Sequence, residues 1–525
     1  MAGHPMNAPA PPIWKLAGVS PAAIALEDHR RQVRFGELEE RTNAIGHGLG
    51  ALGVQPGDHV ALVASNRAEF IEALLGATRA GMLVTPVKTS WTAAEIEYLL
   101  RDAGSRAVVT DVDTARAAAA AAGIPAIDLE RGVDGAGFER WLATQATRPL
   151  PRERTGWRLS YTSGTTGRPK GVHRFADSRL PWCEAFVASR SIAATAHLPV
   201  DGPHLNVSAL FHGAPLAYSL SLLANGCTMR IARRWDAGAA LEALGRDVRS
   251  TCMVPTMFRQ LLALPAERRR AFRAPALGAV LHGGEPCPQP VKRQMMEWLG
   301  PILVEYYGMT EGGLTIATAA DWLARPGTVG RPALGMQVLV LGPDGQRLKP
   351  GAQGTIYFLP PSGKLFEYRR EPEKTAAAHT RDGAFTVGDI GYVDADGYLF
   401  IAGRTADVIV SGGVNVYPAE IEEALAAQPG VRDLCVVGGP DDVRGETPVA
   451  FVVLEPDACR DPAAEQATLD ALAAACEARL AGYLRPRRLV VRDVLPRDPT
   501  GKLLRHVLRA ELWEGHKSNF AAPTR

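Results

Sequence analysis

The segment of this sequence with the most evident chemistry runs from Tyr161 to Gly171 and reads YTSGTTGRPKG. Glycines let backbone N–H groups approach an anion closely, hydroxyl groups donate further hydrogen bonds, and a lysine adds a mobile positive charge. This combination predicts a loop that binds phosphate groups. The candidate phosphate-binding residues are Thr162, Ser163, Gly164, Thr165, Thr166 and Lys170.

The spacing within this segment argues against one common class of phosphate-binding protein. The GxxxxGK[ST] pattern of P-loop NTPases is absent from it. Composition alone leaves a second alternative open, because a linker without any ligand is also rich in Ser, Thr and Gly.

The surrounding residues predict the elements that position this loop. Residues 59–64 (HVALVA) predict a buried strand, 67–81 an amphipathic helix and 82–87 the next strand. Such alternation predicts βαβ crossovers and a mainly parallel sheet. Further along, LGAVLHGGEP at 277–286 predicts a strand that ends in a glycine-rich turn. Open α/β sheets bind their ligands at the carboxyl ends of such strands.

Two changes of pattern predict the domain organisation. From about Gly327 short alternating strands with the hairpin signal Pro343-Asp344-Gly345 predict a small β subdomain. After Arg404 helices and strands alternate again. We expect an α/β protein with a large N-terminal domain of parallel α/β sheets plus a small β subdomain, followed by a small, mobile α+β C-terminal domain. The expected boundaries are a flexible tail at 1–12, the N-terminal domain at 13–403, a hinge at 404–406, the C-terminal domain at 407–515 and a tail at 516–525.

The composition limits the classes of molecule that this protein is expected to bind and the compartment in which it is expected to lie. Among 525 residues, 58 Lys and Arg face 56 Asp and Glu, and no basic block suits a nucleic acid. The seven cysteines include no CxxC pair, which argues against a disulfide framework and a structural zinc site and fits a reducing cytoplasm. The N-terminus lacks a signal-peptide pattern, and no stretch reaches the ~18 apolar residues of a membrane span. We therefore expect a cytoplasmic protein without an integral membrane segment.

The loop and four later segments together resemble one family. YTSGTTGRPKG resembles the signature loop of the adenylate-forming superfamily of acyl-CoA synthetases, adenylation domains and luciferases. In the family's order, YYGMTE at 306–311 resembles its YGxTE segment, TVGD at 386–389 its TGD segment, Gly403-Arg404 the start of its hinge, and PTGK at 499–502 its PxGK loop. The matches extend from about residue 35 to 505.

This resemblance implies an ATP site. Tyr307 is implied to stack on adenine, Asp389 to accept hydrogen bonds from the ribose hydroxyls, and Arg404 to contact the ribose or phosphates. Taken alone, Tyr307 also suits a buried core and Arg404 a surface ion pair. The further residues that the resemblance places around the nucleotide are Gly283, Gly284, Glu285, Tyr306, Gly308 and Met309.

The resemblance also implies the catalytic groups. Glu311, beside Thr310, is implied to bind Mg²⁺ together with Thr162, since Mg²⁺ takes one or two hard oxygen ligands from protein plus phosphate oxygens. A carboxylate at a helix N-terminus is the alternative for Glu311. Lys502 is implied to neutralise charge at the α-phosphate as the acid attacks. His212 is implied to position the acid, although a core histidine is an equal alternative.

The implied reaction joins an acid to AMP with loss of pyrophosphate and then passes the acyl group to coenzyme A. For the second step the resemblance implies rotation about 404–406, which brings Gly412 and Gly413 towards the site. Many relatives carry Asp or Lys two residues after the hinge arginine, where this chain has Ala406. An amine acceptor, a separate carrier protein and a nucleotide sensor without turnover are the alternatives, and a homodimer is compatible with the sequence.

The same resemblance predicts a hydrophobic acid, aryl or alkyl, because apolar and aromatic side chains are implied to line its pocket. The implied pocket residues are Trp182, His212, His282, Gly283, Tyr306 and Met309.

Overall fold

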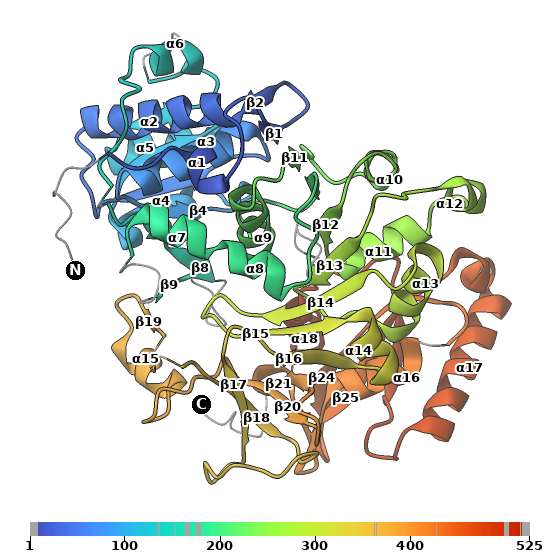
Figure 1. Ribbon diagram of the computed structural model, residues 1–525. Helices are drawn as coiled ribbons and strands as arrows, with labels where there is room; N and C mark the ends of the chain where they lie inside the picture. The colour runs from blue at the N-terminus through green and yellow to red at the C-terminus, as the bar shows by residue number, and fades with distance from the viewer. Residues whose placement is uncertain are drawn as a thin grey trace.

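The computed structural model describes residues 9–133, 135, 137–152, 154–162, 169–174, 180–361, 363, 365–426, 428–497, 503–514 and 516. A larger N-terminal part, coloured blue to gold in Figure 1, is followed by a smaller part in orange and red. The N-terminal part contains one parallel sheet and one larger sheet that is parallel in its middle and antiparallel at its ends, with helices packed on both. The expected fold class is confirmed.

The first layer, the N-terminal sheet, has the strand order β6-β5-β3-β4-β7, and all neighbouring strands are parallel. Its strand β3 (His59–Val63) is buried at every position, as expected for a parallel strand covered on both faces. The other elements of this layer are α1 (Ile13–Ala17), α2 (Phe35–Ala51), α3 (Ala68–Arg79), β4 (Leu83–Pro86), α4 (Ala93–Ala103), β5 (Ser105–Thr110), α5 (Asp113–Ala122), β6 (Ala126–Asp128), α6 (Phe138–Ala143) and β7 (Trp157–Arg158).

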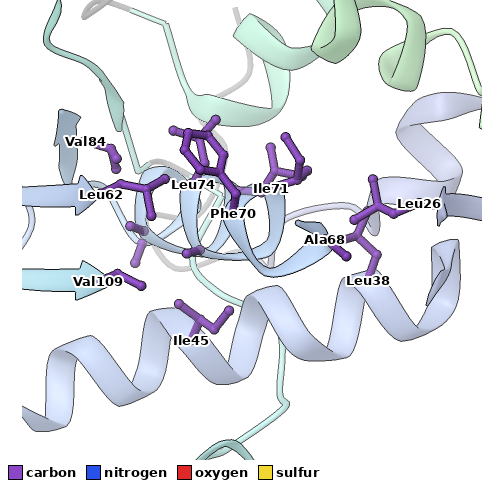
Figure 2. Close-up of a cluster of buried hydrophobic side chains, with 14 of the residues drawn as sticks. Leu26, Leu38, Ile45, Leu62, Ala68, Phe70, Ile71, Leu74, Val84 and Val109 are labelled. Atoms are coloured by element: carbon purple, nitrogen blue, oxygen red, sulfur yellow. The ribbon is translucent and has the colours of Figure 1, made fainter. Parts of the chain in front are cut away.

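Helix α3 forms the centre of the core of this layer, and its residues are buried along its whole length. Figure 2 shows Phe70, Ile71 and Leu74 on the side of α3 that faces away from α2, in one apolar cluster with side chains of the strands. The residue Ala10, within the predicted tail, is also buried, and its N–H donates to the carbonyl of Leu150 at 2.9 Å.

The second layer, the large sheet, has the order β17-β18-β20-β21-β16-β15-β14-β13-β12-β10-β11-β1-β2. Strands β13 (Ala279–Gly283) and β14 (Leu303–Gly308) are parallel neighbours, so their carboxyl ends meet. The expected small β subdomain forms the antiparallel end of this sheet, joined through the pairing of β16 with β15. The other strands are β1 (Ile24–Glu27), β2 (Gln32–Arg34), β10 (His204–Asn206), β11 (Met229–Ile231), β12 (Ser250–Met253), β15 (Leu314–Thr318), β16 (Thr328–Pro332), β17 (Gln337–Leu341), β18 (Gly354–Leu359), β20 (Asp389–Val393) and β21 (Leu399–Arg404).

Helices of the middle of the chain cover the large sheet (Figure 1). They are α7 (Trp182–Ala188), α8 (Arg190–Thr195), α9 (Gly213–Ala224), α10 (Ala237–Leu244), α11 (Pro255–Leu262), α12 (Ala266–Ala271), α13 (Gln289–Leu299) and α14 (Ala319–Ala324).

A small antiparallel sheet, the hairpin sheet, carries the flanks of the predicted phosphate loop. It comprises β8 (Ser160–Thr162), β9 (Lys170–Arg174) and β19 (Phe366–Tyr368), and α15 (Pro372–Ala378) follows β19. Side chains alternate along a strand, so Lys170 and Arg174 share one face of β9 and His173 lies on the other. Tyr368 is paired directly with Val172 and therefore shares the face of Lys170.

The C-terminal part is a sheet with helices on both faces. Alternate residues of β24 (Val431–Asp441) and β25 (Gly445–Leu454) contribute to two separate apolar clusters, one on each face. The other elements are the 3₁₀ turn η2 (Thr405–Asp407), β22 (Ile409–Ser411), β23 (Val414–Val416), α16 (Pro418–Ala426), η3 (Pro456–Cys459), α17 (Pro462–Arg479), β26 (Arg488–Val491) and α18 (Arg505–Trp513).

Candidate active site

The turn after β13 approaches β14 more closely than a side chain would allow. A Cβ atom on Gly283 would lie 2.2 Å from the carbonyl oxygen of Tyr306, and Gly284 has a φ of +82°. Both positions therefore require glycine. The carboxylate of Glu285, which follows, accepts hydrogen bonds from the backbone N–H and the hydroxyl of Thr256 at 2.6 and 2.7 Å. The turn is thus fixed by its own backbone geometry and by α11.

The predicted adenine and ribose residues lie in hydrogen-bond contact. The hydroxyl of Tyr307 donates to Asp389 Oδ2, and Arg404 Nε donates to Oδ1 at 2.9 Å. Asp389 is only 3% exposed, so the Arg404 guanidinium compensates a buried negative charge. Burial and the adjacent Asp389 carboxylate raise the pKa of Tyr307 well above its usual value, so the phenol stays protonated and remains a donor.

The predicted metal ligand Glu311 lies in the turn after β14, and one of its oxygens is held by a tyrosine. Tyr368 of the hairpin sheet donates its hydroxyl to Glu311 Oε1 at 2.8 Å, and burial together with this carboxylate raises the pKa of Tyr368. Among the described residues no hydrogen bond engages Oε2 of Glu311. A hard carboxylate oxygen beside the predicted phosphate-binding residues is a suitable ligand for Mg²⁺, so this side chain fits the predicted ion.

Positive charges lie next to this carboxylate. Lys170 Nζ is 5.9 Å from the centre of the Tyr368 ring. A Cβ on Gly312, beside Glu311, would lie 3.4 Å from the Arg174 guanidinium, which places that arginine at the same turn. The lysine and arginine therefore approach Glu311 from the same face of β9, and both are suited to pair with phosphate oxygens.

Five predicted positions lie on β14, in the turn after it, or at the start of α9, which packs against β14. Tyr306 is buried, packs 5.5 Å from Tyr218 of α9 between ring centres, and has its pKa raised by burial. His212 occupies the N-cap position of α9, and its ring centre lies 4.5 Å from that of Phe211. Gly308 ends β14, and the Met309 N–H donates to the carbonyl of Gly313 at 3.2 Å. Thr310 belongs to the same turn.

Two residues of the predicted acid pocket point elsewhere. His282 is fully buried on the opposite face of β13 from Gly283, with its ring 5.1 Å from Phe258. Trp182 packs in the N-terminal core, where its indole N–H donates to the Thr78 hydroxyl at 3.0 Å. The prediction failed for His282 because adjacent strand residues face opposite sides of a sheet.

The C-terminal part meets the site through Arg497. Its guanidinium lies 3.4 Å from Glu285 Oε2 and 3.4 Å from the Thr256 hydroxyl, and it makes an ion pair of 2.8 Å with Asp433 of β24. Arg497 also forms a β-bridge with Leu503, which brings together the two ends of the segment that contains Lys502. Lys502 itself lies outside the described residues, as do Ser163, Gly164, Thr165, Thr166 and the side chain of Thr162.

The remaining predicted positions lie near the junction of the two parts. The Thr405 N–H, directly after Arg404, donates to the carbonyl of Gly388 at 2.8 Å, and the turn η2 begins there. Gly412 and Gly413 form the exposed turn between β22 and β23, both with positive φ. They lie in the C-terminal part, away from the contacts described for Glu311 and Asp389.

Tyr368, Arg497 and Thr256 were missed by sequence reasoning. Each contacts a predicted residue from a distant part of the chain, and none carries a local pattern of its own. Arg497 had one usable signal, because it lies five residues before Lys502 in the segment that resembles the family's C-terminal loop.

The fold and the site define the class of adenylate-forming enzymes, built from a large nucleotide-binding domain and a small C-terminal domain. The chain belongs to the AMP-binding enzyme family, whose model matches residues 13–362, and the model of the AMP-binding enzyme C-terminal domain matches 420–502. It is an ATP-dependent ligase of the acyl-CoA synthetase type, which adenylates an acid and then transfers the acyl group.

Individual relatives match almost the whole chain. A fatty acid–[acyl-carrier-protein] ligase, ScoC, of Streptomyces coeruleorubidus is 32% identical over 94% of this chain and 94% of its own. A feruloyl-CoA synthase of an Amycolatopsis species is 33% identical over 94% of this chain and 96% of its own. The ATP-bound crystal structure of MatB from Rhodopseudomonas palustris superposes with a TM-score of 0.82 at 29% identity, covering 97% of this chain and 99% of MatB. Among the described residues every helix is too short or too polar to cross a membrane.

Proposed function

We propose that this enzyme activates a hydrophobic carboxylic acid, fatty or aryl, with ATP and transfers the acyl group to coenzyme A, giving an acyl-CoA, AMP and pyrophosphate. One observation carries the proposal. Strand β14 and its turn place Tyr307, bonded to the buried Asp389, and Glu311, bonded to Tyr368, four residues apart. The pair of Tyr307 and Asp389 suits the nucleoside of ATP. The pair of Glu311 and Tyr368 suits its phosphates and their cation.

The nucleoside half is bound by residues of fixed orientation. Asp389 has two oxygens that accept the ribose hydroxyls, and the hydrogen bond from Arg404 fixes the orientation of this carboxylate. The Tyr307 ring and the turn of Gly283 and Gly284 provide an aromatic face and a close backbone for the adenine plane.

The phosphate half is bound by charge. Lys170 and Arg174 neutralise phosphate oxygens, and Glu311, with Thr162, holds the cation. Mg²⁺, when bound, withdraws electron density from the phosphates and stabilises the leaving pyrophosphate. Tyr368 fixes the rotamer of Glu311 through the bond to Oε1.

The first chemical step forms a bond between a carboxylate oxygen of the acid and the α-phosphorus, and the bond to the pyrophosphate oxygen breaks. Lys502 neutralises the charge that develops there. The described contact of Arg497 with Glu285 supports this role, because it brings the ends of the Lys502 segment to the nucleotide-binding turn.

In the second step the thiolate of coenzyme A attacks the acyl carbon, and AMP leaves with the electron pair of the broken C–O bond. The thiol loses its proton to solvent as the thiolate forms, before the attack. Rotation of the C-terminal part about 404–406 withdraws Lys502 and brings Gly412 and Gly413 to the site, where glycines give a narrow thiol arm room beside the backbone.

The preference for a hydrophobic acid is supported by an apolar cluster beside the site. Tyr218 of α9, Tyr306 of β14, Ile316 of β15 and the flanking Ala214 and Leu314 belong to it. His212 lies at the start of α9, at the edge of this cluster. A buried apolar lining favours an alkyl or aryl acid over a charged one.

Transfer to a separate carrier protein is the second candidate, because a relative that matches 94% of the chain is named an acyl-carrier-protein ligase. An amine acceptor leads to the same adenylate and differs only in the final nucleophile.

The test is pyrophosphate release from a panel of fatty and aryl acids, each with coenzyme A, with a carrier protein, with amines or with no acceptor, followed by mass identification of the product. We expect acid-dependent release, faster with coenzyme A, and an acyl-CoA product. Glu311→Gln should abolish release, whereas Glu297→Gln, an exposed glutamate on α13, should leave it unchanged. An amide or acyl-carrier product would replace the coenzyme A assignment, and release independent of any acid would refute the adenylation.

A further inference from the structure

One edge of the hairpin sheet is attached to the end of helix α4 in the N-terminal layer. Arg369, the residue after β19, donates from Nε to the carbonyl of Asp102 at 3.0 Å and from Nη2 to that of Ala103 at 3.2 Å. Both carbonyls belong to the last turn of α4. The last carbonyls of a helix have no partner within it, and a positive charge is favourable there. Arg369 therefore binds the C-terminus of α4 through its charge as well as its hydrogen bonds.

The opposite edge of the hairpin sheet contacts the same helix end. The hydroxyl of Tyr161, in β8, donates to Asp102 Oδ2 at 2.6 Å. Burial, this hydrogen bond and the Asp102 charge raise the pKa of Tyr161 well above its usual value, so the phenol stays protonated and remains a donor. Since β8 and β19 are the two edge strands of this sheet, α4 holds it from both sides of β9.

The central strand β9 lets these two side chains converge on α4 because it carries a glycine between them. Gly171 is paired with Tyr161, and its carbonyl accepts from the Arg369 N–H at 2.8 Å. A Cβ atom on Gly171 would lie 3.1 Å from the Tyr161 ring and 3.2 Å from Arg369 Cβ, which is closer than ordinary van der Waals contact. Glycine at this position therefore leaves the space that both side chains occupy.

The two faces of the hairpin sheet have different partners. Since side chains alternate along a strand, Gly171 faces α4 while its neighbour Lys170 lies on the face of Tyr368. Tyr368, which donates to Glu311 Oε1, directly precedes Arg369 and points to the other side of the sheet. The face that α4 holds thus lies behind the face that presents the lysine and the tyrosine to the predicted metal ligand.

We propose that Tyr161 and Arg369 are positioning residues for adenylation. Through α4 they hold the hairpin sheet so that Tyr368 fixes Glu311 and Lys170 meets the phosphates of ATP. This role rests on the proposed function, since it requires Glu311 to bind the cation and Lys170 to bind the phosphates. Tyr161 and Arg369 face away from those groups and act through the orientation of the strands that carry them.

The kinetic test is ATP–pyrophosphate exchange at a series of Mg²⁺ concentrations. Arg369→Gln should raise the Mg²⁺ concentration for half-maximal exchange about 2–5-fold, and Tyr161→Phe, which keeps the ring on Gly171, about 2-fold. The KM of the acid should stay unchanged in both. Arg101→Gln is the matched control and should behave as the wild type, because Arg101, in the same turn of α4, pairs with Glu97 of its own helix. An unchanged Mg²⁺ requirement in both variants, or an equal rise in the control, overturns the proposal.

A double-mutant cycle separates positioning from a general loss of stability. In the Tyr368→Phe background the bond to Glu311 is already absent, so Arg369→Gln should raise the Mg²⁺ requirement no further. A rise as large as in the wild-type background would show that Arg369 does not act through Tyr368 and would overturn the proposal. Should Arg369→Gln fail to fold, Tyr161→Phe takes its place in the same cycle.

Hydrogen–deuterium exchange of the full chain without nucleotide tests the attachment to α4 independently of the reaction. Peptides that cover 170–174 and 366–369 should take up deuterium faster in Arg369→Gln and Tyr161→Phe than in the wild type and in Arg101→Gln. Wild-type uptake in both variants refutes the attachment. Failure of the proposed function is seen separately, as an absence of acid-dependent pyrophosphate exchange in the wild type itself.

Discussion

Replacement of Arg497 by glutamine should slow adenylation while sparing the transfer step. Arg497 connects the C-terminal part to the turn after β13 through Glu285 at 3.4 Å, and the two side chains are 18% and 12% exposed. Its pair with Asp433 lies within the C-terminal part and does not itself require contact between the two parts. Only the contacts with Glu285 and Thr256 depend on how the C-terminal part lies against the N-terminal part.

The size of the effect follows from the geometry of that contact. A partly exposed ion pair at this separation contributes about 0.5–1 kcal/mol, so its loss lowers the population of the adenylation arrangement roughly 2–5-fold. ATP–pyrophosphate exchange should fall by about that factor. Thioester formation from supplied acyl-adenylate and coenzyme A should be unchanged or slightly faster, because the competing arrangement becomes less favourable.

Two controls separate this effect from general damage. Arg509→Gln removes an ion pair with Glu446 inside the C-terminal part and should change neither half-reaction. In a double-mutant cycle, Glu285→Gln and Arg497→Gln should be less than additive on exchange, since both remove the same contact. Equal losses in both half-reactions, or full additivity, would refute the role assigned to Arg497.

Three other substitutions have distinct expected outcomes. Ala406→Pro, which fixes φ within the predicted hinge, should slow thioester formation far more than pyrophosphate exchange, and equal slowing would contradict rotation about 404–406. Gly283→Ala should lose ATP binding, measured by calorimetry, because the new Cβ would lie 2.2 Å from the Tyr306 carbonyl oxygen; normal affinity would show that the turn is adaptable. Tyr368→Phe removes the bond to Glu311 and should raise the Mg²⁺ concentration for half-maximal exchange about 3–10-fold, with the KM of the acid unchanged; a rise in the acid KM alone would argue against a positioning role.

The sequence was sufficient for much of the fold because its signals are local. The apolar run at 59–64 and the following amphipathic helix correspond to β3 and α3 within a few residues. The β subdomain was also expected, but its fusion to the large sheet depends on the pairing of β15 with β16, and which strand edges meet is not encoded in local composition.

The candidate site was predictable only where two residues that both belong to recognised motifs contact each other. Tyr307 and Asp389 are 82 positions apart, yet both lie in segments that resemble the family, and the structure brings them into hydrogen-bond contact. Tyr368 reaches Glu311 across 57 positions without any motif, so only the tertiary structure reveals it. For His282 the alternation of side chains along a strand is itself a local signal, because it places His282 on the opposite face of β13 from its neighbour Gly283.

The two apolar clusters that cover the C-terminal sheet have a consequence for the speed of catalysis. Apolar side chains of the C-terminal part itself cover both faces of β24 and β25. This part can therefore rotate without exposing a hydrophobic core to water. The Arg497–Glu285 and Arg497–Thr256 contacts are polar and readily exchanged for water, as is the bond between Gln289 and Glu423. Rotation of the C-terminal part should therefore be limited by solvent viscosity more than by an energy barrier. Where this rotation limits turnover, kcat should fall in proportion to the viscosity added by glycerol or sucrose.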